Sequence, residues 1–212
     1  MAFEAKNIIV GAAPMFLSKK DSTESTYATV LPEGSNVTAN TSIYDPATRE
    51  LTGALGTAYA NVGYTNNGLQ ITYNPTYGSV TVDQLLDTAK LFKESMEVML
   101  ATEFTEATLE NVLKVFGQGA ATLSNDALGL EAGALGQEPT ERQLVAVGQA
   151  PTEGVTKAER VYYARRVLSV QQSQFSLSRN AATTFPVTFR LLPVEAKTGA
   201  EYGIIVDRVL VA

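Results

Sequence analysis

Beyond residue 142 the chain is a succession of short segments whose apolar side chains recur at the period of two that is typical of β-strands. We predict strands there at residues 143–147, 158–170, 172–177, 185–192 and 202–211. Residues 143–147 are apolar on both sides of the strand, which predicts burial on both faces. Strands that follow one another in this way favour a mostly β (α+β) chain folded as an antiparallel β-sandwich or barrel.

The N-terminal third is less regular. An apolar stretch at residues 7–17 predicts that residues 1–17 form an N-terminal strand or arm. Residues 18–61 are rich in Ser, Thr, Asn and Gly, and they predict a long projecting loop region. Short strands are expected inside it at 26–31, 36–44 and 51–60. Asp45-Pro46 predicts a turn, because proline fixes φ and the Asp side chain can bond the turn backbone.

Two further turn signals follow. Asn66-Asn67-Gly68 separates the apolar segments 58–64 and 69–73, and it predicts a tight hairpin because Asn and Gly both tolerate positive φ. Residues 74–78 predict a second turn, which leads into a short strand at 79–85.

One segment has the apolar spacing of an amphipathic helix. Residues 106–116 place four apolar side chains on one stripe, at Leu109, Val112, Leu113 and Phe116. Thr105 is expected to cap its N-terminus, and Gly117 is expected to end it. We therefore predict one flanking helix at 105–117, followed by a second long loop at 117–141.

Residues 87–104 fit two patterns. As a helix they form one stripe of apolar residues, and helix propensity favours this interpretation. As a strand, Phe92, Met96, Val98 and Leu100 point one way, and Lys93, Ser95 and Glu97 point the other. Periodicity alone leaves both alternatives open.

The composition excludes much of catalytic chemistry. Cys, His and Trp are absent, so the chain lacks a thiolate, a disulfide and the commonest general base and metal ligand. We predict that the protein is not an enzyme and holds no metal or cofactor. The 16 Lys and Arg against 22 Asp and Glu give a net charge of −6, which disfavours a nucleic-acid reader. Only 18% of residues are charged, which leaves neutral surface of the kind that subunit contacts use.

The candidate sites have ordinary structural explanations. The densest acidic series consists of Asp83, Asp87, Glu94, Glu97 and Glu103. Lys90 and Lys93 interrupt it, so a solvated face is a better interpretation than a carboxylate pair or a calcium site. Arg165-Arg166 is expected to form ion pairs in an acidic chain. The clustered tyrosines, Tyr59, Tyr64, Tyr73 and Tyr77, are expected to serve packing or an interface.

Several stretches follow one another in an order that carries a resemblance. They are residues 61–69 (NVGYTNNGL), 79–84 (SVTVDQ), 96–103 with 108–112 (MEVMLATE and TLENV), and 184–189 (TFPVTF) with the later Tyr202-Gly203. The matching positions are Val62, Gly63, Tyr64, Gly68, Asp83, Leu109, Glu110, Phe185 and Pro186. From residue 58 onward the chain thereby resembles the major tail tube protein of long-tailed, siphovirus-type bacteriophages.

The resemblance implies a single tail tube domain over residues 1–212, built as a β-sandwich with one flanking helix. It implies hexameric rings that stack into a hollow tube, with region 18–61 between rings. In that family the segment before the helix is a strand of the tube wall, so we predict a strand at 91–104. Sheet pairing commonly overrides local helix propensity.

The same resemblance implies a place and a set of partners. The protein would be part of the virion tail, assembled in the cytoplasm of the host bacterium, with no membrane involved. Its partners would be further copies of itself, a tape-measure protein, and tail terminator and distal tail proteins. Double-stranded DNA would pass through the lumen without specific binding, since an acidic wall repels phosphates.

Two hypotheses and one alternative follow. Glu94 and Glu97 are expected to face the lumen, and region 18–61 with the N-terminal arm is expected to make contacts between rings. The alternative is a monomeric β-sandwich that binds carbohydrate or a surface receptor through exposed Tyr64, Tyr73 and Tyr77.

Overall fold

The computed structural model describes most of the chain. The described residues are 9, 11–19, 32, 41–82, 87–119, 122–136, 139–151, 157–171, 173–177, 179–180 and 182–210, without the side chain of residue 157. The strands are β1 Met15–Ser18, β2 Tyr44–Asp45, β3 Glu50–Leu51, β4 Tyr59–Asn61, β5 Thr65–Thr81, β6 Thr88–Phe104, β7 Leu123–Ser124, β8 Ala127–Leu128, β9 Arg142–Gln149, β10 Lys157–Ser169, β11 Phe185–Leu191 and β12 Gly203–Leu210. The helices are α1 Ala54–Ala58 and α2 Leu109–Val115. The predicted mostly β class with antiparallel pairing is confirmed.

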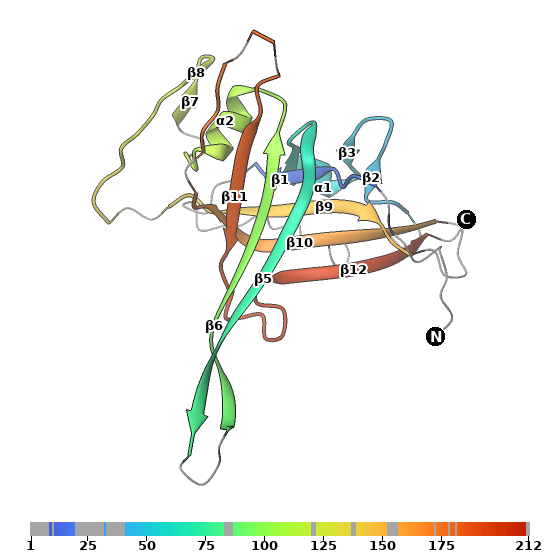
Figure 1. Ribbon diagram of the computed structural model, residues 1–212. Helices are drawn as coiled ribbons and strands as arrows, with labels where there is room; N and C mark the ends of the chain where they lie inside the picture. The colour runs from blue at the N-terminus through green and yellow to red at the C-terminus, as the bar shows by residue number, and fades with distance from the viewer. Residues whose placement is uncertain are drawn as a thin grey trace.

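The main sheet bends into two layers. Its strand order is β4-β1-β9-β10-β11-β6-β5, and β12 also pairs with β10. The first part of β10 lies beside β12, and its last residues, from Val167 to Ser169, pair with β11. A register shift between Ala164 and Val167 separates the two parts. As Figure 1 shows, β5, β6 and β11 therefore cross over β9, β10 and β12 as a second layer.

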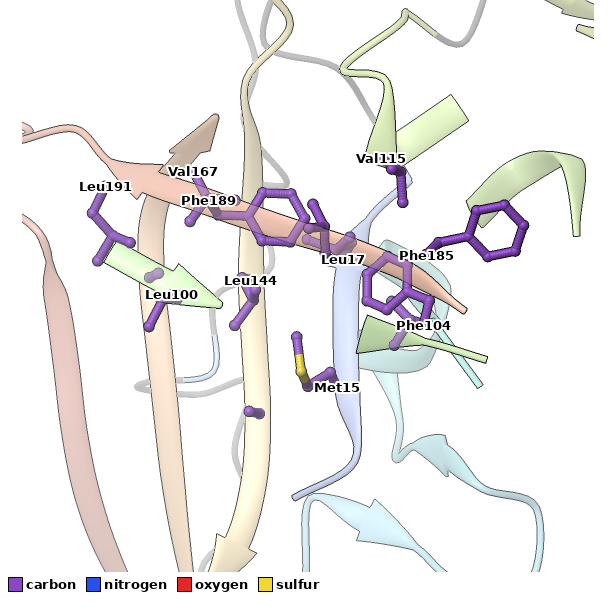
Figure 2. Packing of buried hydrophobic residues seen from close by; sticks show 14 of the residues in the cluster. Met15, Leu17, Leu100, Phe104, Val115, Leu144, Val167, Phe185, Phe189 and Leu191 are labelled. Carbon is purple, nitrogen blue, oxygen red and sulfur yellow. The ribbon is translucent and has the colours of Figure 1, made fainter. Parts of the chain in front are cut away.

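Apolar side chains fill both sides of β9. Leu144 and Ala146 join the core between the two layers, which also contains Phe104, Phe185 and Phe189 (Figure 2). Val145 and Val147 point the other way, into a second cluster that is covered by α1 and by β2 and β3. The predicted burial of this strand on both faces is thus confirmed, because its alternate residues belong to two separate cores.

The β5–β6 pair is a long hairpin that extends beyond the core (Figure 1). The predicted turns at Asn66-Asn67-Gly68 and at 74–78 are wrong, since both lie inside β5. Asn67 and Gly68 do have positive φ, at 62° and 65°. They form a bulge where the register shifts between Asn66 and Gln70. The predicted positive φ is therefore confirmed, but it makes a bulge in one strand and does not close a hairpin.

The strand prediction at 91–104 is confirmed by β6. From Val98 onward its even-numbered residues are buried, and the odd-numbered ones are partly exposed. A helix would have spread these side chains around its axis, whereas the strand directs all of them into the core between the layers.

The helix is shorter at its start than predicted. α2 begins after Thr108, whose hydroxyl accepts a hydrogen bond from the Asn111 amide at 3.2 Å, so Thr105 is not its cap. The predicted end at Gly117 is confirmed. Gly117 has φ 65° and donates to the Lys114 carbonyl, and Gln118 donates to the Leu113 carbonyl.

Other predicted segments differ from the structure. Within region 18–61, residues 41–61 are packed against the sheet instead of projecting, with Ile43 buried. The expected strand at 51–60 contains α1. The expected strand at 26–31 and residues 36–40 of the one at 36–44 lie outside the described residues, and of the remainder only Tyr44 is in a strand. The Asp45-Pro46 turn is confirmed, since Asp45 Oδ1 accepts from the Ala47 amide at 2.9 Å.

Two loop segments are also defined. Residues 173–177 do not form the predicted strand, and Phe175 contacts the rings of Phe116 and Phe185 instead. Within 117–141, the small hairpin β7–β8 turns at Asn125 and Asp126, both with positive φ. Leu135 in the same loop is fully exposed.

Candidate functional site

Some of the residues that carry the resemblance, residues 62–64 and Asn111, meet where β4 passes into β5 beside α2. The Tyr64 amide donates to Glu106 Oε1 at 2.9 Å, and the Tyr64 carbonyl accepts from the Thr105 amide at 2.9 Å and from its hydroxyl at 2.7 Å. Asn111 Nδ2 donates to the Val62 carbonyl at 2.8 Å, and it is buried. These bonds fix the end of β6 and the start of the helix against the strand junction, which we call the motif junction (residues 62–64, 105, 106 and 111).

Gly63 is required at this place for two reasons. Its φ of 79° lies in the left-handed region, and a Cβ atom there would stand 2.1 Å from Glu106 Cδ. Any side chain would therefore expel the carboxylate that holds the Tyr64 amide. The sequence pattern placed Glu106 and Asn111 in or beside the helix, but it did not predict their bonds to the strand junction or the cap at Thr108. Thr105 and Thr108 are both of a residue type that caps helices, so the local sequence does not choose between them.

The remaining motif positions are spread over the same end of the β5–β6–β11 layer. Phe185 and Pro186 pair with Phe104 and Glu103 across the β6–β11 ladder. Gly68 lies in the β5 bulge with open space around it. Leu109 is 40% exposed, so the predicted helix stripe is shifted away from it. Asp83 lies outside the described residues.

Glu110 and Lys114 of α2 form an ion pair in which the lysine is buried and the glutamate is exposed. The Lys114 side chain is only 2% exposed, and Glu110 Oε1 lies 2.9 Å from its Nζ. Among the described residues the buried ammonium has no further polar partner, so it depends on this one carboxylate. Burial lowers the pKa of Lys114, and Glu110 opposes this shift.

Glu94 and Glu97 both lie on β6, in different settings. Glu97 is partly exposed and lies 3.6 Å from Arg190 of β11. Glu94 is exposed and is the extra residue of a bulge, since Thr76 pairs with Ser95 and Tyr77 with Lys93. Which surface these carboxylates line in an assembly stays a prediction.

The same bulge reverses the alternation of β6. Lys93 lies opposite Tyr77 and stacks over Tyr73, 5.8 Å from its ring centroid. Phe92 lies over Gly78 on the other face of the hairpin. The predicted grouping of Phe92 with Met96, and of Lys93 with Glu97, is therefore wrong, because an extra residue exchanges the two faces of the strand.

Beyond the core, the hairpin exposes apolar side chains on both faces. They are Ile71, Tyr73, Tyr77, Val80, Leu91 and Phe92, of which Leu91 is 65% exposed. The face with Tyr73 continues into an apolar groove of about 390 Å³ between the hairpin and the β10–β12 pair. Its lining includes Ile71, Met96, Tyr162 and Ile205. We call the exposed apolar side chains of the hairpin, together with this groove, the hairpin surface.

A second cleft, with a mixed polar and apolar lining, lies at the motif junction. Its volume is about 680 Å³, and its lining includes Tyr44, Arg49, Asn61, Tyr64 and Glu106. The Arg49 guanidinium lies over the Tyr64 ring at 5.2 Å and donates to its hydroxyl. Both groups are thus engaged with each other.

The remaining charges mostly serve the fold. Arg166 donates two hydrogen bonds of 2.6 Å to Glu141, and Arg165 donates to the Ala200 carbonyl at 3.0 Å, so the expected ion pairing holds for Arg166. Among the residues described, no group of three or more Asp or Glu side chains could hold a metal ion. None of the described helices is long and apolar enough to cross a membrane.

Comparison with known proteins adds no relative. Neither protein-family models nor curated protein sequences match this chain significantly.

Proposed function

We propose that the protein is a structural subunit that polymerises with copies of itself, as stacked hexameric rings, into the hollow tail tube of a siphovirus-type bacteriophage. The observation that carries this proposal is the hairpin surface. A monomer exposing a long hairpin with apolar side chains on both faces would be prone to aggregate, whereas a partner that covers both faces stabilises it.

The resemblance supplies the kind of partner. Of the residues that carry it, residues 62–64 and Asn111 lie at the motif junction and hold the root of the hairpin, whereas residues 79–81 lie toward its outer end. In the assembled tube, the lumen would be a passage for double-stranded DNA, vacated by a tape-measure protein. Terminator and distal tail proteins would close the two ends. The virion is then the place of action, after assembly in the bacterial cytoplasm.

Electron microscopy of the purified protein tests this directly. We expect rings or hollow tubes of constant diameter. A variant in which Asn-Gly replaces residues 76–95 removes the outer hairpin, whose first and last residues, Thr76 and Ser95, face each other. It should remain folded and monomeric. Uniform monomers of the unaltered protein at high concentration would refute the proposal.

Region 18–61 needs a narrower test than its complete removal. Deleting residues 33–49 would also delete Ile43, which is buried, so loss of tubes could reflect misfolding. Deleting residues 33–40 spares the packed part. If the region joins rings, this variant should give single rings without tubes.

The alternative, a monomeric module that binds carbohydrate, has one observation in its favour. Tyr64, Tyr73 and Tyr77 are 60%, 59% and 58% exposed. However, the Arg49 guanidinium covers the Tyr64 ring, and Lys93 Nζ lies over the Tyr73 ring, which leaves Tyr77 as the least covered of the three rings. Glycan-array binding by a monomer, abolished by Tyr77→Ala, would favour this alternative over the tail tube.

A further inference from the structure

β12 presents an edge without the devices that normally protect sheet edges. Its register with β10 is unbroken from Gly203, opposite Ala164, to Leu210, opposite Lys157. No proline and no bulge interrupts it, and within the described part of the chain it pairs with β10 alone. An edge of this length and regularity is a template for another strand.

The two charged residues of β12 are engaged inside the subunit. Asp207 accepts two hydrogen bonds from Arg160, at 2.5 and 2.7 Å. Arg208 pairs with the buried Glu159, also on β10. Neither is free to repel an incoming strand. Ile205 and Val209 lie on either side of Asp207 on the same face of β12, and they are 63% and 48% exposed.

β5 has the other long edge, and most of it is interrupted. Its register with β6 shifts between Asn66 and Gln70, between Thr76 and Tyr77, and again near Thr81. Pro75 has no N–H to donate. The longest stretch in regular register is residues 70–76, which pair with residues 95–101, and residues 77–80 form a shorter one. Pro75 leaves residues 70–74 as the part of the longest stretch with an uninterrupted series of backbone N–H groups.

We propose that the outer edge of β12 in one copy pairs with residues 70–74 of β5 in the next copy. This rests on the proposed function, which supplies the second copy as partner. Because two different edges meet, the contact is head-to-tail, and it continues until a ring closes. Ile71 and Tyr73 of one copy then lie beside Ile205 and Val209 of the next, on the face that continues the core between the layers. Their partial exposure in the single chain, 44% and 59% for Ile71 and Tyr73, is removed in the ring.

Because the chain has no cysteine, engineered disulfides give a clean test. A Tyr73→Cys protein is mixed with an Ile205→Cys or a Val209→Cys protein of different mass, under assembly conditions and mild oxidation. The mixture should give a disulfide-linked heterodimer, because facing positions on paired strands lie within disulfide reach. The chain carrying both changes should give a ladder of covalent oligomers. Leu177→Cys, at a position that is 86% exposed, is the control and should give no heterodimer.

Each outcome decides the question. Homodimers from Ile205→Cys alone would mean that β12 pairs with itself, which overturns the proposal. Rings or tubes without any heterodimer would overturn this edge assignment and leave the proposed function standing. Absence of both assemblies and cross-links would overturn both.

A charge substitution gives a second readout. Ile205→Lys should raise the concentration needed for assembly by more than about tenfold, since a lysine on an edge strand opposes pairing. Its thermal midpoint should stay close to that of the unaltered monomer, because the side chain is already mostly exposed. Leu177→Lys should assemble normally. Equal assembly by both variants would contradict the proposal.

Discussion

Replacing Gly63 by alanine should destabilise the protein through two separable effects. An alanine held near the Gly63 φ of 79° costs about 1–2 kcal/mol. Its Cβ would also stand 2.1 Å from Glu106 Cδ, which forces the carboxylate away from the Tyr64 amide. Losing that exposed hydrogen bond adds about 1–1.5 kcal/mol. The free energy of unfolding should therefore fall by about 2–3.5 kcal/mol for Gly63→Ala.

The chain contains a matched control for the backbone effect. Gly68 has φ 65°, and a Cβ there would meet no atom within 4 Å. Gly68→Ala should thus cost only the conformational part, about 1–2 kcal/mol. Guanidinium unfolding of the monomer, followed by circular dichroism, measures both variants. A domain of this size changes its melting temperature by about 2–4 °C per kcal/mol, so calorimetry gives an independent measure.

Removing Glu106 should make the two Gly→Ala substitutions equal in their effect on the free energy of unfolding. In a Glu106→Ala background no carboxylate stands beside residue 63, so Gly63→Ala should then cost no more than Gly68→Ala. The coupling between positions 63 and 106 is the difference, about 1 kcal/mol. Equal costs for the two glycine substitutions in the unaltered background would refute the reasoning, as would a Gly63→Ala cost that Glu106→Ala leaves unchanged.

Two further predictions concern buried charges. Lys114→Met should raise the free energy of unfolding by about 1 kcal/mol at neutral pH, since an apolar side chain of similar length replaces a buried ammonium. Because the folded-state pKa of Lys114 lies below 10.5, the unaltered protein gains stability as pH rises from the folded pKa toward 10.5, so the advantage of the variant should shrink in alkaline denaturant titrations. Glu159→Gln should lower the free energy of unfolding by about 3 kcal/mol, since it removes the buried carboxylate that pairs with the partly buried Arg208. A loss under 1 kcal/mol in guanidinium titrations would show that the pair is dispensable.

The sequence predicted those structural features that a single residue or its immediate neighbours determine, and it failed where a distant strand determines them. The Asp45 turn and the Gly117 helix end were predicted correctly, because a single side chain or a missing one determines each. The start of α2 was not, since both Thr105 and Thr108 are suitable caps. Thr105 instead bonds a distant strand, at the Tyr64 carbonyl.

The hairpin shows the limit more clearly. Asn67-Gly68 favours positive φ in any context, but β6 decides whether that geometry closes a turn or makes a bulge. The bulge at Glu94 likewise depends on the partner strand, and it exchanges faces that period two alone assigns wrongly. Of the candidate site, the exposed tyrosines were visible in the sequence, whereas the free edge of β12 follows only from the order of strands.

The burial of β9 on both faces also determines how the chain must fold. Phe16 of β1 pairs with Val145 of β9, and more than half of the chain lies between them. Closing so long a loop is slow, because its entropy is lost before the contacts form. Until β1 arrives, β9 is an apolar strand with an open side, and at high concentration it would pair with other chains. Refolding yields should therefore fall steeply with protein concentration. Incorrect association between chains is expected mainly before the native subunit has formed.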